Sequence, residues 1–163
     1  MPLEAEGLRF LRVVDRERIR AGEYEKEGAS GLLTNAADQV LLQLRDDIPM
    51  IRYPGHWSLP GGLLEPGETP EDAFRREMLE ELSWAAGAVE PFGMILDAYG
   101  NLVNYFTARL DVPPDALTLG KGREIRFFGP DDVTGLSIPP HATEVLAHFF
   151  AHPGQRFGTT RMP

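Results

Sequence analysis

A chain of 163 residues with 42% hydrophobic and 25% charged residues is long enough for one globular domain and too short for two of ordinary size. Its net charge of −9 disfavours binding to nucleic-acid backbones and anionic membrane surfaces, and no apolar run approaches the roughly 20 residues that cross a bilayer. The absence of cysteine excludes disulfides, thiolate metal sites and a cysteine nucleophile. The charged N-terminus also lacks the apolar segment of a signal peptide, so we expect a cytoplasmic protein.

The first third of the chain predicts short strands separated by polar turns. Residues 1–27 are rich in charge, and the spacing of Leu8, Leu11 and Val14 is compatible with either a short amphipathic helix or a strand. Strands are expected over 31–34 and 39–44 with the turn at 35–38, and the polar, proline-bearing segment 46–55 is expected to be a loop. A short strand at 57–59 should end at Gly61 and Gly62.

A helix is predicted to begin at Thr69 and Pro70, a capping hydroxyl followed by proline at the first helical position. Its apolar stripe is Phe74, Met78 and Leu82. Beyond it, strands are expected over 89–99 and 101–110, joined by a hairpin at 100–101, with a loop over 113–123, a strand over 124–128, a helix from 139–140 to about 150, and a loose tail. This order predicts an α/β (α+β) fold in which a mixed sheet lies between helices.

Seven of the 25 residues from Pro60 to Trp84 are acidic, and three of them, Glu77, Glu80 and Glu81, are crowded together in the second half of this helix. With Phe74 placed at 0°, ideal geometry puts Glu81 at about −20°, Glu77 at about −60° and Glu80 at about −120°. The three carboxylates therefore share one sector that adjoins the buried stripe, where they repel one another. Hard divalent cations such as Mg²⁺ bind carboxylate oxygens, so we expect a cation to neutralise this cluster.

The spacing of the same stretch resembles the Nudix box, G-x5-E-x7-R-E-U-x-E-E-x-G-U, in which U is a bulky apolar residue. Gly62, Glu68 and the run from Arg76 to Trp84 match every position except one, where Ser83 stands in place of glycine. The preceding segment 57–62 is similar to the lead-in strand of that family. The resemblance extends over about residues 28–150, so we expect an N-terminal extension at 1–27, a Nudix domain at 28–152 and a tail at 153–163.

The resemblance implies a Nudix fold and Mg²⁺-dependent hydrolysis, with Mn²⁺ as a substitute, of a nucleoside diphosphate linked to another group. By the same resemblance, Glu77, Glu80 and Glu81 are the metal ligands, and Glu68 is a further ligand through water. Arg76 would pair with Glu68, and Gly61 and Gly62 would offer backbone groups to metal or phosphate. Ser83 should lower stability slightly, since serine lacks glycine's easy left-handed turn.

The general base is not identified by the box, because members of the family place it differently. Glu81 and Glu124 are both candidates, and Lys121, Arg123, Arg45 and Arg52 are candidates for phosphate binding.

Aromatic residues on the strands and loops could stack on a base, although a core position is the commoner alternative: Tyr53, Phe92, Tyr99 and Tyr105. His148 and His152 stand four residues apart but lack the glutamate of the H-E-x-x-H metal motif, so we interpret them as structural.

Two other functions are alternatives to hydrolysis. A Nudix-fold module that binds a nucleotide without cleaving it usually lacks box glutamates, whereas all are present here. The isomerase branch that acts on isopentenyl diphosphate relies on a cysteine that this chain lacks. Nucleoside triphosphates, oxidised nucleotides and nucleotide sugars remain as candidate substrates, and a homodimer is compatible with the sequence without being required by it.

Overall fold

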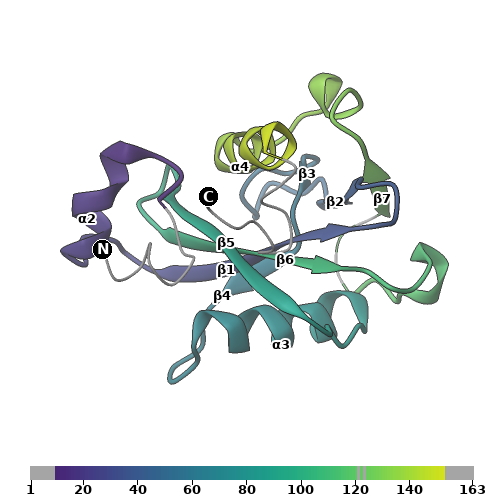
Figure 1. The fold of residues 1–163 in the computed structure, drawn as a ribbon, viewed down its shortest axis with the longest axis horizontal. Coiled ribbons are helices and arrows are strands. Elements are labelled where there is room, and N and C mark those ends of the chain that lie inside the picture. The colour runs from purple at the N-terminus through teal and green to yellow at the C-terminus, as the bar shows by residue number, and fades with distance from the viewer. Residues whose placement is uncertain (1–9, 121, 123, 153–163) are drawn as a thin grey trace, which may run out of the picture.

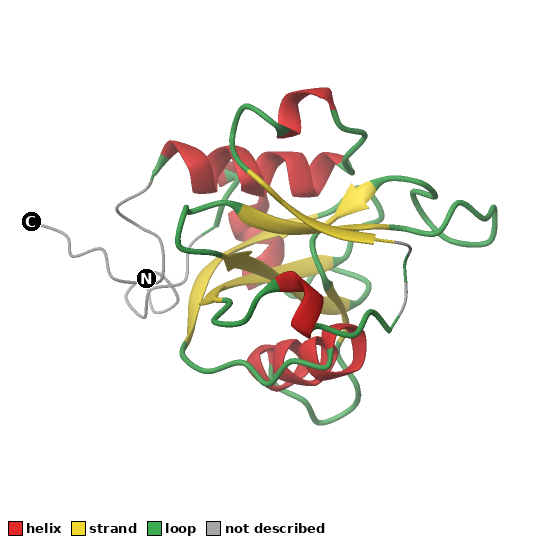
Figure 2. Cartoon of the chain, turned by 90° about the vertical axis from the view of Figure 1, so that its right-hand side faces the viewer, coloured by secondary structure: helices red, strands yellow, loops and turns green. Residues whose placement is uncertain are grey.

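The computed structural model describes residues 10–120, 122 and 124–152. In this part of the chain, one mixed seven-stranded sheet lies between helix α3 (Pro70–Leu82) and helix α4 (Pro140–Ala151), as the two views in Figure 1 and Figure 2 show. The mixed sheet between helices that the sequence predicts is therefore confirmed. Leu8, Lys121, Arg123 and the predicted tail beyond residue 152 lie outside the described residues.

The sheet is built around β1, which pairs with strands on both sides. Its strands are β1 (Glu27–Thr34), β2 (Val40–Leu44), β3 (Trp57–Ser58), β4 (Gly61–Leu63), β5 (Val89–Leu96), β6 (Leu102–Arg109) and β7 (Glu124–Phe128). The main path runs β3-β2-β1-β6-β5, with β4 beside β1 and β7 beside β2. Only the β1–β6 pair is parallel among the described strands, and this pair places β1 at the centre of the sheet.

Alternating side chains of the central strands supply two cores, one beneath each helix. Leu32 packs into the core that contains Phe149 of α4, whereas its neighbour Leu33 packs into the core that contains Phe74 of α3. Phe127 and Phe128 likewise belong to opposite faces, because successive side chains of a strand point to opposite sides of the sheet. Burial on both faces explains why β2 appears in the sequence as a nearly continuous apolar run.

Three boundaries differ from the sequence-based expectation. β1 begins at Glu27 instead of residue 31, because its first residues pair with both β4 and β6. Gly61 does not end a strand but begins β4, since an added Cβ there would lie 2.3 Å from the Ala29 carbonyl oxygen and only glycine allows this approach. The turn between β5 and β6 spans residues 97–101 and is longer than the expected two-residue hairpin.

The segment before β1 is folded against the sheet. It forms a 3₁₀ turn, η1 (Val13–Asp15), and a short helix, α2 (Arg16–Arg20). Two further 3₁₀ turns, η2 (Pro114–Ala116) and η3 (Val133–Gly135), connect the later elements.

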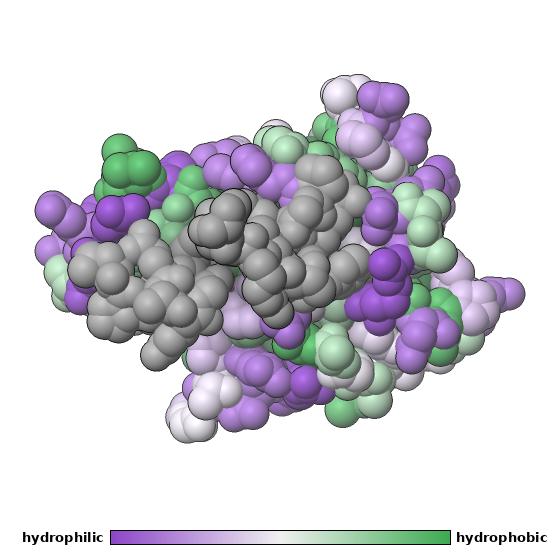
Figure 3. All heavy atoms as spheres, viewed as in Figure 1, coloured by the Kyte–Doolittle hydropathy of each residue, from purple (hydrophilic) through white to green (hydrophobic). Residues whose placement is uncertain are grey.

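The surface is largely hydrophilic on the side of α3, as the space-filling view shows (Figure 3). Large apolar residues that are exposed are spread over separate elements, for example Val13 near the N-terminus, Met50 in a loop and Leu79 on α3. Within the described residues, no helix has the length and apolar composition needed to cross a membrane.

Candidate functional site

The site is organised by the N-terminus of α3. The Thr69 hydroxyl accepts a hydrogen bond from the Asp72 backbone N–H at 3.1 Å, and the Asp72 carboxylate accepts one from the Thr69 N–H at 3.3 Å. This reciprocal capping box, with Pro70 at the first helical position, confirms the predicted helix start. It also fixes the position of Glu68, the residue before Thr69, relative to the acidic side chains of α3.

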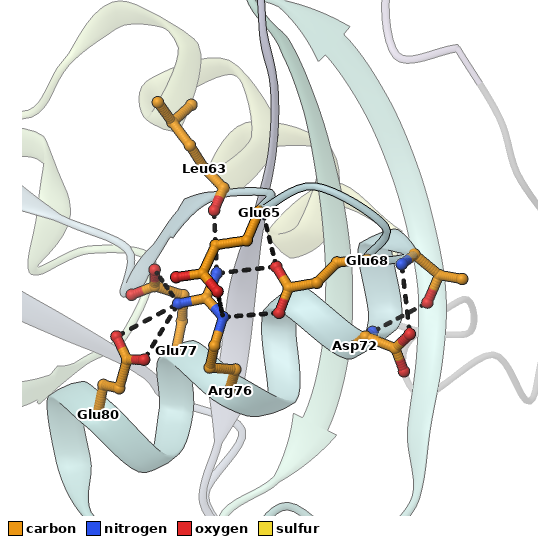
Figure 4. A network of polar contacts seen from close by, with 8 residues as sticks. Leu63, Glu65, Glu68, Asp72, Arg76, Glu77 and Glu80 are labelled. Atoms are coloured by element: carbon orange, nitrogen blue, oxygen red, sulfur yellow. Dashed lines mark hydrogen bonds and ion pairs between the residues drawn. The ribbon is translucent and has the colours of Figure 1, made fainter.

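Arg76 lies at the centre of a group of acidic side chains and forms ion pairs with four glutamates, Glu65, Glu68, Glu77 and Glu80 (Figure 4). Its Nε donates to Glu68 at 2.6 Å, and one Nη donates to Glu77 at 3.1 Å and to both carboxylate oxygens of Glu80 at 3.2 Å. The other Nη donates to Glu68 at 3.0 Å and to the Leu63 carbonyl at 3.0 Å. Arg76 thus ties the glycine-bearing strand β4 to the acidic face of α3.

These contacts shift the ionisation of both partners. The hydrogen bond from Arg76 is the main cause that lowers the pKa of Glu68, and the bond to Glu68 is the main cause that raises the pKa of Arg76. The sequence predicted this pair but not the additional contacts of Arg76 with Glu77 and Glu80. The Arg76 guanidinium therefore provides part of the positive charge that offsets the cluster, and the expected divalent cation stays a prediction.

The exposure of the three helix glutamates follows the predicted helical angles. Glu81 is 3% exposed and Glu77 is 6% exposed, whereas the Glu80 side chain is 56% exposed. The predicted order from the buried stripe outward was also Glu81, Glu77 and Glu80. Two carboxylates are therefore held inside the protein, one turn apart, and the third lies at the rim.

Gly61 and Gly62 bring backbone against the two buried carboxylates. The Gly61 N–H donates to Glu81 Oε2 at 2.8 Å. A Cβ added at Gly62 would lie 2.2 Å from Glu77 Oε2, so a side chain there would displace that carboxylate. The two glycines thus orient the buried carboxylates, and the expectation that they also offer backbone groups to metal or phosphate stays a prediction.

The donor set fits a hard divalent cation in its chemistry, because the acidic face of α3 offers several carboxylate oxygens. Its present arrangement is not that of a closed coordination sphere. In the described part of the chain, no three acidic or histidine side chains are grouped as a metal site. Glu80 and Glu68 instead direct their oxygens at Arg76.

Two cavities adjoin at this site. The smaller, of about 210 Å³, is lined by Glu81, Gln43 and Asp46 among others, and the larger, of about 380 Å³, by Tyr53, Tyr99 and His141 among others. Their shared wall is formed by Arg45, Ser58, Leu59 and Gly61. A carboxylate-bearing cavity thus opens next to an aromatic one.

The aromatic cavity is organised around Tyr53, whose backbone has the positive φ of 52° that bulky residues rarely adopt. The Tyr53 ring lies 5.5 Å from His56, 6.1 Å from Tyr99 and 6.1 Å from His141, between ring centroids. The Arg52 guanidinium stacks over Tyr99 at 3.6 Å from the ring centroid. Burial is the main cause that raises the pKa of Tyr53 and lowers the pKa of His141.

The other predicted residues are divided between the cavities and the core. Arg45 lines both cavities, Arg52 lines the larger one, and Tyr105 lines the larger one while its ring is buried. Phe92 packs in the core against Phe149. Lys121 lies outside the described residues, so its predicted role remains a prediction.

The two histidines at the end of α4 have a structural contact. Their rings stack at 6.1 Å between centroids, and His152 Nδ1 lies 3.0 Å from the His148 carbonyl oxygen. Glu124, the other candidate base, begins β7, where its carboxylate pairs with Arg126. Glu124 is not among the residues that line either cavity.

Sequence reasoning missed Asp97, His141 and Asp46. Asp97 and His141 line the larger cavity and Asp46 lines the smaller one. They come from a turn, a helix start and a loop that are far apart in the chain, and no local pattern connects them. The only signal was the polar character of segment 46–55.

Comparison with known proteins agrees with this geometry. The sequence model of the NUDIX domain matches residues 25–152. A putative 8-oxo-dGTP diphosphatase of Bacillus subtilis is 38% identical over 68 residues, 42% of this chain and 42% of that protein. The nucleoside triphosphatase NudI of Escherichia fergusonii is 47% identical over 51 residues, 31% of this chain and 35% of NudI. The matched regions thus span less than half of these curated relatives.

Solved structures share the fold at lower sequence identity. The MutT protein of Methanosarcina mazei has a TM-score of 0.67 at 18% identity, covering 80% of this chain and 96% of that chain. The NUDIX domain of Shewanella oneidensis NrtR, solved with ADP-ribose, has a TM-score of 0.66 at 18% identity, covering 85% of this chain and 98% of that chain. Together with the match over 25–152, the fold and the site residues lead to one conclusion: this chain belongs to the NUDIX domain family.

Proposed function

We propose that this protein is a divalent-cation-dependent hydrolase that cleaves the pyrophosphate linkage of a nucleoside triphosphate, an oxidised nucleotide or a nucleotide sugar. The observation that carries the proposal is the pair of adjoining cavities, one with a buried carboxylate and the other with aromatic walls. A nucleotide has the same two parts, a charged phosphate chain and a planar base. The phosphate chain would occupy the smaller cavity and the nucleoside the larger one.

Mg²⁺, with Mn²⁺ as a substitute, would be held by Glu77, Glu80 and Glu81, with Glu68 as a further ligand through water. When bound, such a cation polarises phosphoryl oxygens and lowers the pKa of a coordinated water. For Glu80 and Glu68 to serve as ligands, they would have to exchange contacts with Arg76 for contacts with the cation.

The chain's own residues would supply orientation and charge. Arg45 stands in the wall that both cavities share, where its guanidinium can bind a phosphate that lies between them. The Gly61 N–H donates to Glu81 Oε2 at 2.8 Å and so orients the Glu81 carboxylate. Glu81 is the better candidate for the general base, because it lines the phosphate cavity whereas Glu124 pairs with Arg126.

A nucleoside triphosphate is the substrate that the named relatives favour, since they are described as a diphosphatase of 8-oxo-dGTP and as a nucleoside triphosphatase. Binding without cleavage remains the competing function. The complete set of box glutamates supports hydrolysis.

A substrate panel tests the proposal. With Mg²⁺, wild-type protein should release phosphate, pyrophosphate or nucleoside monophosphate from at least one of nucleoside triphosphates, 8-oxo-dGTP and nucleotide sugars. Replacing Glu81 with glutamine keeps the acceptor for the Gly61 N–H but removes the charge, and it should lower kcat by about 10²- to 10⁴-fold. Glu71→Gln is the matched control, because Glu71 pairs with Arg75 on the exposed surface of the same helix.

Two results would contradict the proposal. If Glu81→Gln retained full Mg²⁺-dependent turnover, the catalytic role of Glu81 would be wrong. If nucleotides bound without any turnover, with or without Mg²⁺ or Mn²⁺, the binding module would be the correct function.

A further inference from the structure

The segment that precedes the matched NUDIX domain completes the outer edge of β5. Phe10 forms a parallel bridge with Met94, and the Leu11 N–H donates to the Met94 carbonyl at 2.9 Å. Phe10 and Ile19 then pack with apolar residues of β5 and β6, among them Leu96. Residues 10–20 lie outside the matched range 25–152, so the match assigns them no role.

Beyond this bridge, two side chains take the place of a neighbouring strand. The Leu96 N–H donates to Asp15 Oδ2 at 3.1 Å, and the Leu96 carbonyl accepts a hydrogen bond from Arg12. Arg12 Nε also lies 3.1 Å from Asp15 Oδ2, and the Asp15 side chain is only 4% exposed. The ion pair therefore holds both hydrogen-bonding groups of the last residue of β5.

Leu96 leads directly into a turn that lines the larger cavity. The next residue, Asp97, accepts hydrogen bonds on Oδ1 from the Tyr99 N–H at 2.8 Å and from the Asn101 N–H at 2.9 Å. Asp97, Tyr99 and Asn101 all line the cavity. A shift of Leu96 would therefore be passed to the cavity wall through one peptide unit and the Asp97 carboxylate.

Arg12 also reaches helix α4, which lines another part of the same cavity. Arg12 Nε lies 3.4 Å from Glu144 Oε2, and His141 and Ala142, one turn earlier on α4, line the cavity. Burial is the main cause that lowers the pKa of His141. The charge of Asp97 raises this pKa, and the charge of Arg12 lowers it. Arg12 thus lies near the wall without lining it.

We propose that Arg12 and Asp15 are positioning residues for the nucleoside part of the substrate. They hold the 97–101 turn and the start of α4 at the separation that lets the nucleoside bind between them. This inference rests on the proposed function for its substrate. Both residues lie before the matched range 25–152. The phosphate cavity, which neither residue contacts, should be unaffected by their loss.

The test separates the nucleoside from the phosphates. Arg12→Met and Asp15→Asn are assayed with the best nucleotide from the panel, and with inorganic tripolyphosphate as a substrate or a competitive inhibitor. We expect KM for the nucleotide to rise about three- to tenfold with kcat changed less than about twofold. KM or Ki for tripolyphosphate should not change, and Arg12→Lys should recover part of the lost affinity.

Arg109→Met is the matched control, since Arg109 also binds a backbone carbonyl, that of Asn35, and lies 3.7 Å from a carboxylate, that of Asp38. It lines neither cavity and should leave KM unchanged. Equal changes for nucleotide and tripolyphosphate, or no change for either, would overturn the proposal.

A second measurement does not depend on turnover. Amide hydrogen exchange of the full chain should be faster at residues 97–101 in Arg12→Met than in wild type and in Arg109→Met. Calorimetric titration with a nucleoside monophosphate should show a weaker affinity in the same variant. If no substrate is cleaved, the proposed function fails, while faster exchange and weaker nucleoside monophosphate binding would still support the positioning role of Arg12 and Asp15. Unchanged exchange at residues 97–101 would overturn that positioning role. Should Arg12→Met not fold, the nearly isosteric Asp15→Asn undergoes the same measurements.

Discussion

Arg76 has a larger role than its place in the sequence motif indicates. The motif pairs it with Glu68, yet its guanidinium also contacts Glu77, Glu80 and the Leu63 carbonyl. A planar cation with five donors can serve several acceptors at once, which lysine cannot do with the same geometry. A divalent cation entering this cluster would compete with Arg76 for the same oxygens.

Ser83 shows how a departure from the family pattern is accommodated. We expected serine to lack an easy left-handed turn, yet Ser83 adopts φ 55° and ψ 39° and ends α3 with its N–H bonded to the Leu79 carbonyl. The left-handed conformation is unfavourable for an L-residue other than glycine. Ser83 therefore ends the helix in a conformation that glycine adopts more easily, and the residue is strained.

Replacing Ser83 with glycine should stabilise the protein by about 0.5–1 kcal/mol, because relief of the strain exceeds the added flexibility of the unfolded chain. For a chain of this size, that corresponds to an increase of about 1–4 °C in Tm. Thermal unfolding with and without the substitution measures it, with Ser83→Ala as a control that should not stabilise. A lower Tm in Ser83→Gly would show that the serine side chain makes a stabilising contact.

At the scale of elements, the site depends on how closely α3 approaches β1. A Cβ added at Gly31 of β1 would lie 2.4 Å from Cε1 of Phe74, whose ring is fully buried. Phe74 also begins the apolar stripe that orients the glutamates. Glycine at position 31 thus sets the distance between the acidic helix and the sheet.

Gly31→Ala should therefore destabilise the protein by about 1–3 kcal/mol through overpacking. Urea unfolding measures this change. Gly87→Ala provides the control, because an added Cβ there has no heavy atom within 4 Å. Equal stability of the two variants would mean that Phe74 moves aside without penalty.

At the scale of the whole molecule, His141 and Glu68 couple stability to acidic pH. Burial lowers the pKa of His141 from its usual 6.5, and Arg76 lowers the pKa of Glu68 from its usual 4.5. In each case the unfolded chain binds a proton at a higher pH than the folded chain does. Stability should therefore fall as pH drops below about 6.5, and fall again below about 4.5.

Thermal unfolding between pH 8 and pH 3.5 measures both steps. His141→Gln should remove most of the decline between pH 7 and pH 5, and Glu68→Gln should reduce the decline below pH 4.5. His148→Gln is the control, because it removes another histidine of the same helix and should leave the decline between pH 7 and pH 5 in place. An unchanged decline between pH 7 and pH 5 in His141→Gln would assign that step to other groups.

Local patterns in the sequence determined the elements and the acidic face. Helix α3 was predictable from Thr69, Pro70 and the spacing of Phe74, Met78 and Leu82, because capping and 3.6-residue periodicity act within one segment. The graded burial of Glu81, Glu77 and Glu80 followed from the same periodicity. The family was recognisable because its motif is contiguous in the chain.

Only the tertiary structure decided what lies opposite that face. Asp97, His141 and Asp46 reach the cavities through pairing and packing between segments far apart in the chain, which no local pattern records. β4 was not predicted, because glycine has a weak preference for strands. Its glycines are required instead by the close approach of neighbouring backbone and carboxylate groups. The role of residues 10–20 was equally hidden, since Arg12 and Asp15 acquire it only where β5 ends beside them.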